Sequence, residues 1–184
     1  MILNDKKIAL WISRTAVFTA LIIVLQAATA SLGNPIITGS IVNLLLIIAV
    51  MTSGLLSGLS VAAVSPVAAK IMGIGPLWSI LPFIVAGNAV LVLSWYFIGN
   101  RNIGGKRYFA YITALIAAAA AKFFVLYIGI VQIAVPVFLN LPERQAAVIS
   151  NMFSISQLIT ALLGGALAVV LFPRLRRAIS REQG

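Results

Sequence analysis

The chain alternates between long apolar stretches and short segments rich in glycine, proline, asparagine and basic residues. Six stretches, the second shorter than the others, approach the roughly 20 apolar residues that a helix needs to cross a hydrocarbon core about 30 Å thick. The pattern therefore predicts an all-α protein, a bundle of six transmembrane helices over the ranges Ile8–Ala30, Ile36–Met51, 55–72, Leu77–Ile98, Tyr108–Ala134 and Gln145–Phe172.

Residues that favour turns separate these helices. The segment 33–35, Gly-Asn-Pro, ends the first helix, and Gly54 separates the second from the third. Residues 136–144 are expected to form a loop, and Pro173 is expected to stop the sixth helix. Pro66 lies inside the third helix and should bend it, because proline removes one backbone hydrogen bond.

Composition supports a membrane protein, since 62% of the 184 residues are hydrophobic and only 9% are charged. The six helices leave little chain over, so residues 1–184 are predicted to form a single transmembrane domain. The first apolar stretch follows Lys6 and Lys7, as in a secretion signal. It greatly exceeds the apolar region of about 7 to 15 residues in such signals. We therefore expect a retained first helix.

The basic residues are distributed unequally between the two ends of the predicted bundle. With six spans, both termini lie on one side of the membrane, and ten of the 13 basic residues fall on that side: Lys6, Lys7, Arg14, Arg101, Lys106, Arg107, Arg174, Arg176, Arg177 and Arg181. The positive-inside rule makes this side cytoplasmic. The expected location is the bacterial cytoplasmic membrane. This bias and attraction to anionic lipid account for the net charge of +10, so no nucleic-acid partner is expected.

The residue inventory excludes most catalytic chemistry. The chain has no cysteine, no histidine and only three acids, Asp5, Glu143 and Glu182. Thiolate nucleophiles, imidazole bases and the usual zinc sites are therefore absent, and no cofactor or metal is expected. A serine with a lysine base remains formally open, but no spacing singles out a pair. Segment 100–107 is not a phosphate-binding loop, because Asn100 and Arg107 replace its glycine and its serine or threonine.

Lys122 lies near the middle of the fifth apolar stretch, whereas no acid falls inside any span. A charged residue at this depth costs about 3 kcal/mol or more, so it usually faces a cavity, a substrate path or a counter-charge. The missing counter-charge suggests a cargo molecule. Lys122 could also bond backbone carbonyls, or its stem could reach an interface. Lys70, near a helix end, could simply lie among the lipid headgroups.

Several uncharged polar residues are candidates for ligand contact. Amide side chains occur within the second, fourth and sixth spans, at Asn43, Asn88, Asn151 and Gln157. Each needs a hydrogen-bond partner away from water, and bonding between helices explains any one of them as well as ligand contact does. Ser150, Ser154 and Gln157 are expected to form one stripe on a continuous sixth helix.

Two interpretations are open for the aromatic residues near the span ends and for a pair of small residues in the first span. Trp78 and Tyr127 lie close enough to the membrane boundaries to be interfacial anchors, and Trp78 could also stack on a flat ligand. Ala16 and Ala20 are spaced for close helix packing. Packing within the bundle is one explanation of this pair, and docking of a partner membrane protein is the other.

Several of these features together resemble the substrate-binding S components of energy-coupling factor (ECF) transporters. The resemblance spans nearly the whole chain. It is carried by the short-looped spans and by four features: the pair Ala16 and Ala20, the segment Ile37–Asn43, the run Gly73–Trp78, and Pro82, Phe83 and Gly87-Asn88.

The resemblance implies a subunit without its own ATPase, and not an enzyme. Such a subunit captures a vitamin or vitamin precursor near the outer face, beneath the loop after the first helix and between helices four to six. It implies that Ala16 and Ala20 contact a coupling membrane subunit, and that two separate ATPases supply energy. The loaded subunit is thought to topple in the membrane. The expected substrate contacts are Asn34, Thr38, Asn43, Lys70, Trp78, Asn88, Lys122, Tyr127, Asn151 and Gln157.

Two functional alternatives and the substrate remain open. A self-sufficient secondary transporter of a small organic solute is the main rival, and a membrane scaffold is the other. Proton coupling lacks its usual carboxylate or histidine relay here, whereas sodium coupling stays open. Amides and aromatics favour a hydroxymethylpyrimidine or pyridoxine type of substrate, while pantothenate or another carboxylated vitamin makes more direct use of Lys122. The absence of histidine argues against nickel or cobalt.

Overall fold

The computed structural model describes residues 5–75, 77–101 and 107–182, and all regular structure in these ranges is helical. The elements in chain order are α1 (Asp5–Ala30), α2 (Pro35–Ser53), α3 (Leu55–Ile71), the 3-10 turn η1 (Trp78–Ile80), α4 (Leu81–Ser94), the π-helix η2 (Trp95–Gly99), α5 (Arg107–Leu126), the π-helix η3 (Tyr127–Phe138), α6 (Glu143–Met152) and α7 (Ile155–Glu182). The all-α prediction is confirmed.

Within the described residues, five helical stretches are long and apolar enough to cross a membrane: Asp5–Ala30, Pro35–Ser53, Trp78–Gly99, Tyr108–Phe138 and Glu143–Phe172. The sixth predicted span is α3, an apolar helix of 17 residues. At 1.5 Å per residue it is about 26 Å long, slightly short of a typical hydrocarbon core. Pro66 lies inside α3 as expected. The arrangement is that of a multi-pass membrane protein.

A glycine makes the tight connection between α2 and α3. Gly54 has a positive φ of 87°, a conformation that favours glycine, and its amide N–H donates to the Val50 carbonyl oxygen at the end of α2. Gly58 then lies against Val50, where an added Cβ would be 2.7 Å from the Val50 Cβ. The two helices can therefore pack closely from their first turn.

The fifth span is longer than predicted. The sequence predicted that it ends at Ala134 and that residues 136–144 form a loop, but helical structure continues as η3 to Phe138, with Pro136 inside it. The wider hydrogen-bond spacing of a π-helix accommodates the proline. The Leu139 amide donates to the Ala134 carbonyl five residues earlier, at 3.0 Å. The connection to α6 is reduced to residues 139–142.

The sixth span is not one continuous helix, and that prediction was wrong. It is interrupted at Phe153 and Ser154, between α6 and α7. The Gln157 amide and the Ser154 and Ser156 hydroxyls donate to backbone carbonyls of Met152 and Asn151. These side chains supply hydrogen-bond donors to carbonyl groups at the end of α6 that lack a partner within the helix. The expected polar stripe is therefore broken.

Pro173 does not end the last helix, which was also predicted wrongly. Helix α7 runs through it to Glu182. A proline removes one hydrogen bond from a helix, and this loss can be absorbed by a bend instead of a stop.

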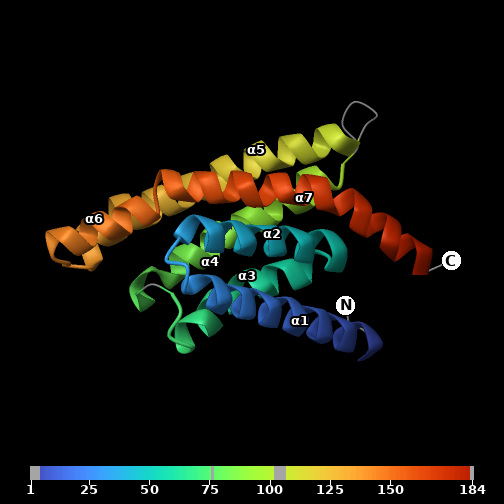
Figure 1. Ribbon diagram of the computed structural model, residues 1–184, viewed down its shortest axis with the longest axis horizontal. Coiled ribbons are helices and arrows are strands. Elements are labelled where there is room, and N and C mark those ends of the chain that lie inside the picture. The colour runs from blue at the N-terminus through green and yellow to red at the C-terminus, as the bar shows by residue number, and fades with distance from the viewer. Residues whose placement is uncertain (1–4, 76, 102–106, 183–184) are drawn as a thin grey trace.

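The helices run roughly along one direction, as Figure 1 shows. The start of α1 and the end of α7 lie at one end of the bundle, and α6 lies at the other. A large apolar cluster that includes Leu46, Val61 and Trp95 joins α2, α3, α4 and α5. A smaller cluster, Ile80, Leu126, Ile130, Ala134 and Phe153, joins η1, η3 and the α6–α7 break. The described core thus has two parts.

Candidate functional site

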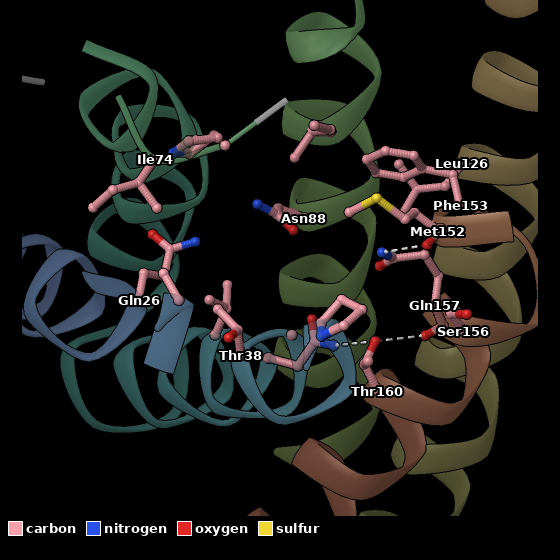
Figure 2. Close-up of a pocket in the computed structure, with 18 of the residues that line it drawn as sticks. Gln26, Thr38, Ile74, Asn88, Leu126, Met152, Phe153, Ser156, Gln157 and Thr160 are labelled. Carbon is pink, nitrogen blue, oxygen red and sulfur yellow. Dashed lines mark hydrogen bonds between the residues drawn. The ribbon is translucent and has the colours of Figure 1, made fainter. Parts of the chain in front are cut away.

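A cavity of about 460 Å³ lies inside the bundle. Its lining comes from the end of α1, the first half of α2, α3, the middle of α4, α5, the α6–α7 break and the start of α7. It also includes Gly33, Asn34 and Gly75 from connecting segments. Figure 2 shows side chains from these elements arranged around the space. Its volume is within the range of small-molecule sites, about 300 to 1,000 Å³.

Lys122 from α5 forms a buried polar group at the cavity together with two amides. Its Nζ donates to Asn43 Oδ1 of α2 at 2.6 Å and to Asn88 Oδ1 of α4 at 2.7 Å. The three side chains are almost completely buried, with 4%, 1% and 3% of their surface exposed. Each lies near the middle of its helical span. The ammonium is therefore held inside the protein and does not point into lipid.

The hydrogen bonds continue from this group to α7. Asn43 Nδ2 donates to Thr160 Oγ1 at 3.3 Å, and Thr160 Oγ1 donates to the Gln157 carbonyl oxygen at 3.0 Å. Figure 2 shows Thr160 and Gln157 on the same side of the space. Four helical elements thus meet at one polar cluster, which we define as Asn43, Asn88, Lys122 and Thr160 and call the polar floor.

Small residues allow the helices to come close enough for these contacts. An added Cβ at Gly164 of α7 would lie 2.5 Å from the Ser40 carbonyl oxygen and 2.8 Å from Asn43 Cβ on α2. A Cβ at Gly39 would meet Thr160, and one at Gly87 of α4 would meet Leu126 of α5. The backbones approach each other because these side chains are missing.

The charge in the cavity is unbalanced. Among the described residues that line it, Lys122 is charged and no carboxylate is present. Neutral amide oxygens solvate the ammonium but do not cancel its charge. Within the described ranges, no group of three acidic, histidine or cysteine side chains could hold a metal ion. The arrangement therefore suits an organic molecule that offers hydrogen-bond acceptors.

Above the polar floor, the wall is a mixture of apolar and polar side chains. Val42, Ile84, Leu126 and Phe153 supply apolar surface. Gln26 faces the space from α1, on the side opposite Met152 and Gln157 in Figure 2. The Gln26 Oε1 atom is buried and has no hydrogen-bond partner among the described residues. In Figure 2 the amide nitrogen of Gln26 lies on the side of the space and the oxygen lies on the far side, so this side chain presents an N–H donor to a ligand.

The structure brings together six of the ten predicted contact residues. Asn34, Thr38, Asn43, Asn88, Lys122 and Gln157 all line the cavity. Some of their polar groups already have partners. Asn34 Oδ1 accepts the Ile36 amide at the start of α2, and Thr38 Oγ1 donates to Thr29 Oγ1 at 2.8 Å.

The other four predicted contact residues lie outside the cavity lining. Lys70 is half-buried near the end of α3, Asn151 is exposed on α6, and Trp78 is 57% exposed. Tyr127 stacks on Phe123, with ring centroids 5.5 Å apart, and its hydroxyl accepts from Gln132 Nε2 at 2.8 Å.

Two further results concern the predicted pair Ala16 and Ala20 on α1 and two cavity-lining residues that were not predicted. Ala16 and Ala20 are both exposed, so this pair faces away from the bundle. Gln26 and Ser156 line the cavity but were not predicted. Gln26 is an amide inside the first span, as Asn43 is inside the second, and the same reasoning would have identified it.

Comparison with known protein families gives a match over most of the chain. Residues 11–176 match the family described as ECF transporter, substrate-specific component. These residues include the whole cavity lining and the pair Ala16 and Ala20. No curated protein and no solved structure matches the chain significantly.

Proposed function

The chain belongs to the substrate-specific components of ECF transporters, and from this premise we propose that it captures a vitamin or vitamin precursor in the cavity above the polar floor. Members of this family bind the substrate of a transporter and are not enzymes. In this proposal the chain has no ATPase of its own and delivers its cargo inward only together with partner subunits.

The observation that carries the proposal is the polar floor beneath a cavity of about 460 Å³. Lys122 is buried near the middle of a membrane span and is held by amides from two other helices. Ionisable groups at such depth commonly mark a substrate path, because burial in lipid alone would be too costly. A packing role alone would not require the adjoining space.

The proposed orientation places the cavity toward the outside. Lys6, Lys7 and Arg14 lie in the first half of α1. The segment between η2 and α5, which contains Arg101, lies at the same end of the bundle in Figure 1, and the positive-inside rule assigns this end to the cytoplasm. The connecting residues Gly33, Asn34 and Gly75, which line the cavity, belong to the opposite end. We propose that this end faces outward from a bacterial cytoplasmic membrane.

The proposed partners are a coupling membrane subunit and two ATPase subunits. Ala16 and Ala20 are exposed on α1, whose membrane-spanning part is the least buried of the five long spans. Small side chains on a lipid-facing surface let another helix approach closely. We propose that the coupling subunit binds at this pair.

Native mass spectrometry of the wild-type protein after gentle extraction tests the capture function. The expected result is a mass higher than that of the polypeptide by one small molecule, which dissociates on activation. A denatured sample is the control, because a covalent adduct would remain. Protein that never carries or takes up a small organic molecule would contradict capture.

Reconstitution into liposomes separates this function from that of a self-sufficient secondary transporter. The purified chain alone should bind but not accumulate the compound identified by mass spectrometry. Accumulation should require ATP and the co-reconstituted coupling and ATPase subunits. Strong uptake by the chain alone, driven by an ion gradient, would establish the rival function.

A further inference from the structure

We propose that the captured compound is a small monocarboxylate whose carboxylate pairs with Lys122 at the polar floor. This inference rests on the proposed capture function and specifies the chemical class of its substrate. It favours a carboxylated vitamin over a neutral compound of the hydroxymethylpyrimidine or pyridoxine type.

The first argument is the charge of the cavity. The lining contributes one ammonium and, in the part of the chain that the structure describes, no carboxylate. A buried charge without a counter-charge is unfavourable, and removal of one partner from a buried ion pair is strongly destabilising for the same reason. A ligand with a single negative charge would restore neutrality. A phosphate monoester carries about −1.5 to −2 at neutral pH and would exceed the one available positive charge.

The second argument is the hydrogen-bonding capacity that the polar floor retains. The Lys122 ammonium has three N–H donors, of which the two amide oxygens accept two. Asn88 Nδ2 donates to no described residue, and Asn43 Nδ2 donates one of its two hydrogens, to Thr160. The free capacity of these three side chains therefore consists mainly of donors. A carboxylate offers two oxygens that accept only, and such charge-assisted hydrogen bonds are stronger than neutral ones.

The cavity-lining residues outside the polar floor indicate which chemical groups the rest of the compound has. Gln26 lines the space with its amide nitrogen on the cavity side in Figure 2, so it suits a hydrogen-bond acceptor of the compound. Val42, Ile84, Leu126 and Phe153 line the space with apolar surface. The expected compound therefore has an anionic end, a compact and partly apolar body, and a hydrogen-bond acceptor elsewhere.

The substitution Asn88→Asp directly tests the proposed pairing of a ligand carboxylate with Lys122. It keeps the shape of the side chain and supplies Lys122 with an internal counter-ion. An added carboxylate should repel an anionic ligand while the apo protein melts at the same temperature or higher. The control is Asn140→Asp, which adds the same charge at an exposed position outside the cavity lining. Asn140 has a φ of 38°, which aspartate also tolerates.

Binding is measured with the compound released from the wild-type protein and with two probe pairs, pantothenate with pantothenol and nicotinate with nicotinamide. We expect at least one of the acids among these compounds to bind the wild-type protein. Its affinity should fall by about 30-fold or more in Asn88→Asp, which is the lower end of the affinity loss seen when a buried charge pair is disrupted. Its neutral counterpart should bind more weakly to the wild type. Lys122→Gln should remove the preference for the acid, and Lys122→Arg should retain it.

The outcomes distinguish the two proposals. A released compound that is neutral or cationic, or an acid that binds Asn88→Asp as tightly as the wild type, would overturn the carboxylate inference and leave capture intact. Equal binding of an acid by Lys122→Gln and wild-type protein, each with an unchanged melting temperature, would also overturn it. Wild-type protein that holds no small molecule and binds none of the probes would count against capture itself, and the inference would fall with it.

Discussion

At the scale of single residues, the contacts of Lys122 determine what its burial means. Two amide oxygens solvate the ammonium, so the lysine is tolerated near the middle of a span. The sequence identified Lys122, Asn43 and Asn88 as unusual because each is polar within an apolar stretch. It left open whether they bind each other or a ligand. The structure shows that they bind each other and also border a cavity.

Gln26 gives a prediction in which stability and binding change in opposite directions. Gln26→Leu removes a buried acceptor that has no partner among the described residues, and such an atom costs about 1–3 kcal/mol. We therefore expect the ligand-free protein to melt at a higher temperature, while affinity for the captured compound falls. Thermal melts with and without this compound measure both effects.

The matched control is Gln145→Leu. Gln145 is exposed on α6 and does not line the main cavity, so neither quantity should change. If Gln26→Leu lowers the melting temperature and leaves affinity unchanged, Gln26 has a packing role and does not contact the ligand.

At the scale of helices, small residues determine which side chains meet. Gly164 was recognisable in the sequence as a small residue in the last span, and the structure shows its consequence. It lets α7 approach α2 so closely that Asn43 reaches Thr160. The break between α6 and α7 was not predicted, although the polar residues Ser150, Asn151, Ser154, Ser156 and Gln157 surround it in the sequence. It places Phe153 against Leu126 and Ile80 and lets Gln157 line the cavity.

Gly164→Val should therefore separate α2 from α7. The new side chain would overlap the Ser40 carbonyl oxygen and Asn43, and overpacking of this kind costs about 1–3 kcal/mol. We expect a lower melting temperature together with weaker ligand binding, because the polar floor is displaced. Thermal unfolding in detergent and a binding titration measure the two effects.

Ala166→Val is the control for this substitution. Ala166 is exposed on the same helix two residues away, where a larger side chain faces outward. It should leave both measurements unchanged. Normal stability and binding in Gly164→Val would show that α2 and α7 do not need this close contact.

At the scale of the whole molecule, the two ends of the bundle differ. Basic residues of α1 and Arg101 lie at the end where the chain starts and finishes, and the cavity approaches the other end. The chain contains no cysteine, so single introduced thiols report on each end without background. Ser31→Cys should react with a membrane-impermeant maleimide on intact cells, since Ser31 is exposed between α1 and α2.

Asn100→Cys provides the opposite case. Asn100 is exposed after η2, at the basic end, and its thiol should react only after the cells are permeabilised. The reversed pattern would place the cavity on the cytoplasmic side and contradict the proposed direction of capture.

The exposed face of α1 leads to a prediction about assembly. Ala16→Trp or Ala20→Trp should reduce co-purification of the coupling subunit by about tenfold, equivalent to about 1.4 kcal/mol, because a large ring prevents close helix contact. Ligand capture should be unchanged, since neither residue lines the cavity.

Leu21→Trp is the matched control. Leu21 is also exposed on α1 but lies about 100° round the helix from Ala20. It should assemble normally. Loss of ligand capture with intact assembly in the alanine variants would contradict the assignment of this surface.

The sequence by itself determined the fold class, the approximate spans and the polar residues inside them. Hydropathy is a local property, and the membrane requires long apolar helices wherever the chain crosses it. Only the tertiary structure decided that Lys122 meets residues 79 and 34 positions earlier in the chain, and that Trp78, Tyr127, Lys70 and Asn151 lie outside the cavity. The rotation of each helix and the close contacts at its glycines determine which side chains face each other. These depend on packing between distant segments, which residue spacing along one helix does not specify.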